Sequence, residues 1–336
     1  FEILNDIKIT SNEKIVLEYL IDIAERMGNY EHAISYIREL ININKQDDEL
    51  LLHLANLYFN LKDYKQTISI LEPIIEGSQS SLEILKILLI SYSNINDLDK
   101  EIMISNRLID EYPDFIIGYE ALVFSYINNN KTTKAIEILI STIEKFPEEV
   151  IFPFTLGSIL YSERQYLKAH KYFLSTLSIN PNYMAAKNVL AMLYEQMNDI
   201  SKSDSLFNEL LQINRNDAIN QNNYAYILSE RKEISIEKLN YALNLAKNAI
   251  KIDPENATYL DTIGWIYYKL GSYNEAEQYL EKSLNINNNN PVILEHMGDI
   301  NVKRNKIVKA VKAYNKALSI DTGNKLIQQK INNIYE

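Results

Sequence analysis

The sequence contains no cysteine and very little glycine or proline. The absence of cysteine from its 336 residues excludes disulfide frameworks, cysteine-ligated metal sites and thiol nucleophiles. Only 8 residues are glycine and 7 are proline, well below the average shares of about 7% and 5%. This composition excludes collagen-like, low-complexity and turn-rich β architectures. A chain with so few helix breakers is expected to be helical throughout.

Long apolar runs and basic clusters are also missing. No apolar stretch reaches the roughly 18 residues that a membrane-spanning helix requires. The chain has 45 acidic and 34 basic residues, a net charge of −11, and no run of five basic residues. Because such a surface repels phosphate backbones, no nucleic-acid partner is expected. Walker A, GxGxxG and HExxH motifs are absent, so the sequence predicts neither catalysis nor a cofactor.

The most informative feature is an internal repeat. Its units begin at residues 14, 48, 82, 116, 150, 184, 218, 257 and 291, with a period of 34 (48 − 14) except for one step of 39 (257 − 218). Within each unit, apolar residues at three- and four-residue spacing predict two helices. A residue such as Gly28 or Asn198 between them can adopt the left-handed conformation of a helix end. Each unit is therefore predicted to be a helical hairpin.

Small residues recur at one position of most predicted helices, although Leu89 and Glu101 replace them in the unit that starts at 82. Examples are Ala55 and Gly264 in first helices, and Ala33 and Ala276 in second helices. Two helices approach to about 8 Å only where the side chains between them are small. These positions are therefore expected to be the contact points within each hairpin.

This pattern resembles the tetratricopeptide repeat family. In the unit 257–290, Ile263, Gly264, Tyr267 and Ala276 fall where the family has its Leu-Gly, Tyr and Ala residues. The resemblance implies an all-α, right-handed superhelical solenoid of about nine hairpins with a C-terminal capping helix. The 39-residue unit and the segment after it resemble bacterial, often exported, members of the family. That narrower likeness suggests an exported, periplasmic or membrane-associated protein, with the cytoplasm as the alternative.

The repeats predict a single domain over residues 1–336. Residues 1–13 fit the second helix of a truncated preceding repeat, 14–324 hold nine repeats, and 325–336 fit a capping helix with a polar outer face. Pro73 predicts a kink or an early helix end, with looser packing beside it. Five extra residues in the unit that starts at 218 predict a longer hairpin turn.

Few residues suggest metal binding or acid–base chemistry. The four histidines fall in different units. His296 and Asp299 are three residues apart on one predicted helix and are expected to form a solvated polar face. Asp261 and Glu295 recur at the same repeat position, one unit apart. They are expected to decorate a groove rather than to act as a catalytic pair.

The resemblance also implies that the first helices line a concave groove. Their inward positions predict a partner-binding set that comprises Phe124, Phe154, Tyr161, Asn188, Met192, Asn222, Tyr226, Asp261, Trp265, Tyr268, Glu295 and Asp299. This groove would be aromatic and amide-rich in its middle and acidic toward the C-terminus. The aromatic residues could instead pack between units. Asn188 and Asn222 are harder to explain as core residues, because buried amides need partners.

The sequence therefore predicts a non-catalytic scaffold that holds a partner peptide or helix. An acidic groove end would suit a basic peptide. Only Lys86 is basic at the groove position that a carboxylate clamp requires, so binding of chaperone C-termini is not expected. The alternatives are a targeting or assembly module of a larger enzyme or of a secretion or envelope complex, and self-association through the solenoid ends. An RNA-binding helical repeat is disfavoured by the negative charge.

Overall fold

The computed structural model describes residues 13–43, 47–76 and 81–335. In these ranges the chain forms 19 α-helices and one 3₁₀ helix, and it forms no strand. None of the described helices is long and apolar enough to span a membrane. The helix expected before residue 13 lies outside the described residues.

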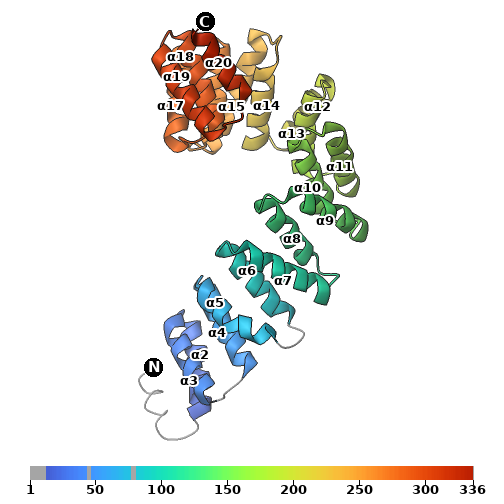
Figure 1. Cartoon of the computed structure of the whole chain (residues 1–336), viewed down its shortest axis with the longest axis vertical. Helices are drawn as coiled ribbons and strands as arrows, with labels where there is room; N and C mark the ends of the chain where they lie inside the picture. Colours follow the sequence, from blue (N-terminus) through green and yellow to red (C-terminus); the bar gives the residue numbers. More distant parts are fainter. Residues whose placement is uncertain (1–12, 44–46, 77–80, 336) are drawn as a thin grey trace. The chain divides into compact units, whose positions relative to one another are not determined.

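The α-helices follow one another as nine pairs and a final single helix (Figure 1). The first helices of the pairs are α2 (Glu13–Arg26), α4 (Asp48–Asn60), α6 (Leu82–Asn94), α8 (Ile116–Asn128), α10 (Ile151–Ser162), α12 (Met184–Gln196), α14 (Ala218–Glu230), α16 (Ala257–Lys269) and α18 (Pro291–Lys303). Their partners are α3 (Tyr30–Ile43), α5 (Tyr64–Leu71), α7 (Leu98–Glu111), α9 (Thr132–Lys145), α11 (Tyr166–Ile179), α13 (Ile200–Ile213), α15 (Ile236–Ile252), α17 (Tyr273–Ile286) and α19 (Ile307–Ile320). The last helix is α20 (Lys325–Tyr335). The predicted all-helical repeat fold is confirmed.

Contacts between residues divide the chain into two compact units. The first unit is Phe1–Leu156 and the second is Gly157–Glu336, so the boundary falls within α10. The candidate site described below lies entirely in the second unit. A single domain over residues 1–336 stays a prediction.

Most hairpin turns contain a residue with positive φ. These residues are Gly28, Lys62, Asn96, Asn130, Arg164, Asn198, Gly271 and Asn305. Glycine and asparagine tolerate this left-handed conformation, whereas lysine and arginine adopt it at a steric cost. The tight turn therefore imposes the same backbone geometry even where the local residue does not favour it.

The 39-residue unit makes its turn differently. Arg231 leaves α14 in an extended conformation, with φ −64° and ψ 133°. The following helix α15 has 17 residues, compared with 14 in α17. The longer turn predicted for this unit is confirmed, and the insertion also lengthens the second helix.

The extended conformation of Arg231 is accompanied by a cluster of ion pairs. Its guanidinium group donates to Glu195 of α12 at 2.9 and 3.1 Å and to Asp204 of α13 at 2.6 and 3.3 Å. The Arg231 side chain is only 11% exposed. The turn after α14 is thus fixed to both helices of the preceding hairpin by charge-assisted hydrogen bonds.

Pro73 ends its helix early, as predicted. Helix α5 stops at Leu71 after 8 residues, and the 3₁₀ helix η1 (Glu72–Glu76) continues it. The looser packing predicted here is wrong. Ile75 of η1 is buried in one core cluster with Leu71 and with Leu85 and Leu88 of α6. The 3₁₀ turn therefore places an apolar side chain in the core beside α6.

Small residues allow the two helices of a hairpin to pack closely. The alanines at the predicted contact position of the second helices are fully buried, for example Ala33, Ala169 and Ala276. In α18 the contact position of the first helix is a glycine, Gly298, and a large side chain faces it. A methyl group added at Gly298 would overlap the ring of the buried Tyr314.

We expect Gly298→Ala to lower the free energy of unfolding by about 1–3 kcal/mol, because it overpacks the contact with Tyr314. Gly323→Ala is the control, since an added methyl group there meets no atom within 4 Å. Urea unfolding followed by the fluorescence of Trp265, the only tryptophan in the chain, measures both effects. Equal unfolding midpoints for the two variants would contradict the packing argument.

Candidate partner-binding groove

The first helices of the second unit line a pocket of about 210 Å³, here called the groove pocket. Its lining residues are Met192, Asn222, Asn223, Tyr226, Thr258, Asp261, Thr262, Asn290, Val292 and Ile293. They belong to α12, α14, α16 and α18, or, for Asn290, to the N-cap of α18. No second helix contributes to this lining. The structure therefore brings four of the predicted groove residues together, namely Met192, Asn222, Tyr226 and Asp261.

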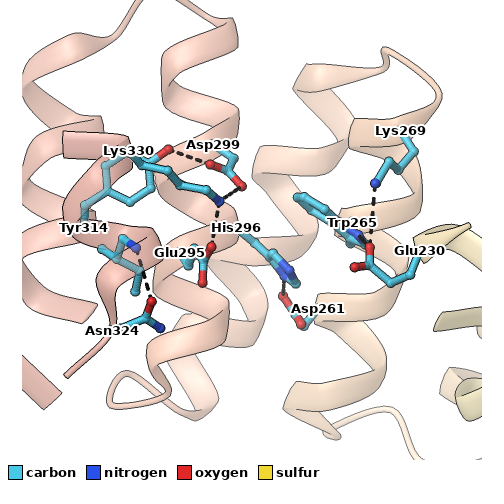
Figure 2. A network of polar contacts seen from close by, with 11 residues as sticks. Glu230, Asp261, Trp265, Lys269, Glu295, His296, Asp299, Tyr314, Asn324 and Lys330 are labelled. Atoms are coloured by element: carbon cyan, nitrogen blue, oxygen red, sulfur yellow. Dashed lines mark hydrogen bonds and ion pairs between the residues drawn. The ribbon is translucent and has the colours of Figure 1, made fainter. Parts of the chain in front are cut away.

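Polar pairs, here called rungs, join α12 to α14, α16 to α18 and α18 to α20 on the side of the second unit that carries the groove pocket. In each rung the sixth residue of a helix bonds the fifth residue of the preceding repeat's first helix. The rungs are Asn223–Asn188 at 2.9 Å, His296–Asp261 at 2.8 Å and Lys330–Glu295 at 2.6 Å. The last two are drawn in Figure 2. Each rung pairs a donor with an acceptor from successive helix pairs, so the groups that bond in these three rungs are satisfied.

The rung between α14 and α16 is open. Thr262 occupies the sixth position of α16, but its hydroxyl donates to the carbonyl of Thr258 in its own helix, at 3.1 Å. Asn222 occupies the fifth position of α14 and is only 2% exposed. Its side-chain oxygen has no hydrogen-bond partner among the described residues. An unpaired buried acceptor costs about 1–3 kcal/mol, which a ligand with a suitably placed donor would recover.

Tyr226 lies beside this open rung in the groove pocket. It is half-buried, and burial raises the pKa of its hydroxyl, with smaller contributions from Glu230, Asp261 and Glu295. The phenol therefore remains protonated at neutral pH and can donate a hydrogen bond as well as accept one.

Trp265 is held within the fold by its neighbours. Its side chain is 8% exposed, and its ring stacks on His296 at 4.0 Å and on Tyr268 at 4.8 Å between centroids. The indole nitrogen donates to Glu230 at 2.5 Å (Figure 2). Tyr268 is half-buried, and burial, with the charge of Asp299, raises its pKa to about 12. The indole therefore offers little free surface to a partner.

The acidic end of the predicted groove is partly neutralised by the chain itself. Lys330 of α20 donates to Glu295 at 2.6 Å and to Asp299 at 2.7 Å (Figure 2). The hydroxyl of Tyr314 also donates to Asp299, at 2.6 Å. Burial disfavours the charge of Lys330, but its hydrogen bonds to the two carboxylates outweigh that effect and raise its pKa. These carboxylates therefore already have a basic partner.

The remaining predicted groove residues do not line the groove pocket. Phe124 of α8 is 44% exposed, and Phe154 of α10 is half-buried. Tyr161 of α10 packs against Tyr166 with 5.8 Å between ring centroids, and burial raises its pKa. Asn188 is buried, and it bonds Asn220 as well as Asn223.

The expectation of a solvated polar face at His296 and Asp299 is wrong for His296. That imidazole is 6% exposed and faces Asp261 across the repeat boundary. Its repeat position placed it between two helices, where a neighbouring carboxylate could pair with it. Among the residues that the structure describes, no group of histidines and carboxylates has a geometry suited to a metal ion.

Several pocket residues were not predicted from the sequence. Asn223 and Thr262 occupy the sixth position of their helices, next to the position that was expected to face the groove. Asn290 caps α18 by accepting from the backbone nitrogens of Val292 and Ile293. The recurrence of polar residues directly after the fifth position was the available signal for the first two.

Comparison with known proteins identifies the repeat. Residues 22–47, 185–217 and 257–290 match the family model of the tetratricopeptide repeat. No curated protein sequence matches the chain.

Solved structures share the fold at low sequence identity. A tetratricopeptide repeat protein from Parabacteroides merdae is 15% identical with a TM-score of 0.64, covering 76% of this chain and 98% of its own. A thermophilic tetratricopeptide repeat protein from Thermus thermophilus is 21% identical with a TM-score of 0.51, covering 56% and 99%. The Cut9-Hcn1 structure of the APC/C is 18% identical with a TM-score of 0.60 and covers 92% of this chain. The chain spans 59% of the length of the matched chain in that structure.

We expect Lys330→Met to lower the free energy of unfolding by about 1–3 kcal/mol at pH 7, because it leaves Glu295 and Asp299 without their shared donor. Since the folded-state pKa of Lys330 is raised, its contribution is complete below the unfolded pKa of about 10.4 and is lost as the pH rises through the folded value. The deficit of the variant should therefore be constant from about pH 7 to 9 and shrink near pH 11.

Urea unfolding of both proteins at each pH measures this deficit. Lys325→Met, which replaces an exposed lysine on the same helix, is the control and should have little effect. A deficit that does not change between pH 7 and pH 11 would refute an ionic role for Lys330.

Proposed function

We propose that this chain, three segments of which match the tetratricopeptide repeat model, is a non-catalytic scaffold that holds a segment of a partner protein in the groove pocket of its second unit. The observation that supports this site is the open rung at Asn222. A buried acceptor without a partner faces a pocket that four successive repeats build together. The backbone N–H of an extended segment supplies the missing donor.

The walls of the groove pocket favour an apolar anchor beside that hydrogen bond. Met192, Val292 and Ile293 provide the apolar surface of the lining. A volume of about 210 Å³ equals roughly seven waters at 30 Å³ each. One side chain of the size of leucine or methionine fits within such a space. The ring of Tyr226 adds contact area at a low cost in conformational entropy.

Charge has a smaller part in this proposal than the sequence suggested. Glu295 and Asp299 are paired with Lys330, and Asp261 is paired with His296. A partner therefore need not be basic. Recognition by one hydrogen bond and apolar contact should depend only weakly on salt concentration.

The test uses peptides selected on the immobilised protein from a random library. Their affinities for the full chain are then measured by fluorescence anisotropy. We expect Asn222→Leu to weaken binding about tenfold, because it removes the acceptor but keeps the volume of the side chain. The neighbouring variant Gln221→Leu is the matched control, since Gln221 does not line the groove pocket.

Circular dichroism establishes that both variants remain helical. Selected peptides that bind the two variants equally well would place their site elsewhere on the chain. Failure to select any peptide would refute peptide binding as the function of the groove pocket.

A further inference from the structure

The second unit carries another pocket, on the side formed by its second helices. This outer pocket has a volume of about 320 Å³. Residues of α13 and α15 line it, together with Arg215 and with Gln221 from the first turn of α14. It shares no residue with the groove pocket. Its volume is at the lower end of the range of small-molecule sites, about 300–1,000 Å³. The peptide-binding function proposed above does not involve it.

Gln221 lines the outer pocket and has an unsatisfied acceptor. It is 4% exposed, and its side-chain nitrogen donates to the backbone carbonyl of Arg215, which fixes the orientation of the amide. Its side-chain oxygen has no hydrogen-bond partner in the described part of the chain. Buried amide oxygens are normally paired. A donor from a ligand in the outer pocket would satisfy this one.

The repeat pattern shows that a glutamine here is not needed for packing. Gln221 occupies the fourth position of its unit. Five other units have leucine at that position, namely Leu17, Leu51, Leu85, Leu260 and Leu294. An aliphatic side chain therefore suits the fold at this place, and the amide adds hydrogen-bonding capacity that the fold does not require.

The other polar groups of the outer pocket narrow the chemistry of its ligand. No carboxylate lines it, so it has nothing to pair with a cation, and Arg215 is its one charged lining residue. An anionic oxygen next to the unpaired oxygen of Gln221 would be repelled. Asn208, Gln212 and Asn248 each offer a donor and an acceptor. This combination fits a neutral ligand with several hydroxyl groups.

Tyr241 supplies an apolar surface in the same pocket. It is 44% exposed, and its ring is held edge-on against Tyr224, with 6.2 Å between centroids. An aromatic ring beside amide groups suits a sugar, which has a C–H face and a rim of hydroxyls. We infer that the outer pocket is a binding site for a neutral saccharide, with Gln221 as the acceptor for one of its hydroxyl groups.

Saturation-transfer NMR on the full chain tests this inference. The probes are D-glucose, D-galactose, D-mannose and N-acetyl-D-glucosamine, each at ~10 mM, which detects dissociation constants in the millimolar range. We expect transfer from the protein to at least one sugar. Gln221→Leu should weaken that binding about tenfold, and Asn248→Ala should weaken it as well. Asn222→Leu, on the groove side of the same helix, should leave it unchanged.

Two results would overturn the inference. One is that none of the four sugars receives saturation from the protein. The other is that a sugar receives equal saturation from the wild type and from the Gln221→Leu variant. Because Gln221→Leu introduces the residue found at this position in other repeats, loss of folding is not expected. The peptide affinities measured for the groove pocket are a separate readout, so either site can fail without the other.

Discussion

The close approach of two helices at one small residue on each is the contact on which the other features of the second unit depend. At two of these contacts, Gly157 against Phe173 and Gly298 against Tyr314, a methyl group added to the glycine would overlap the facing ring. In both cases the partner lies 16 positions along the chain (173 − 157, 314 − 298). This spacing fixes the register of the hairpin. Because the register repeats, residues at one position of successive first helices fall in rows. These rows form the polar rungs and the lining of the groove pocket.

Local signals allowed the fold to be predicted from the sequence. The small residues and the turn residues each act within one hairpin, and the period shows that the hairpin is repeated. Each of these signals can be recognised without knowing what packs against the hairpin. The candidate site was predicted less completely. The positions of Asn222 and Tyr226 followed from the repeat, but the missing partner of Asn222 depends on whether Thr262 bonds across the helices or within its own helix. That choice is made by side-chain packing, which no local pattern encodes.

The acidic end of the groove shows the same limit. Glu295 and Asp299 recur at inward positions and suggested a basic partner. Their actual partner, Lys330, comes from α20, which supplies the sixth-position residue that a further repeat would supply. Only the packed arrangement shows that these carboxylates are satisfied and that the amide oxygens of Asn222 and Gln221 are among the unsatisfied acceptors. These amides lie next to each other in the sequence but face different pockets.

The Arg231 cluster has a consequence for how the solenoid comes apart. In a repeat protein, each unit is stabilised by its own helices and by its nearest neighbours, so unfolding can begin at an end and move inward one hairpin at a time. Arg231 ties the turn after α14 to both helices of the hairpin before it. The nearest-neighbour coupling is therefore stronger at this junction than helix packing alone provides. An unfolding front that reaches it is slowed there, and the two hairpins that it joins tend to open together as one cooperative element.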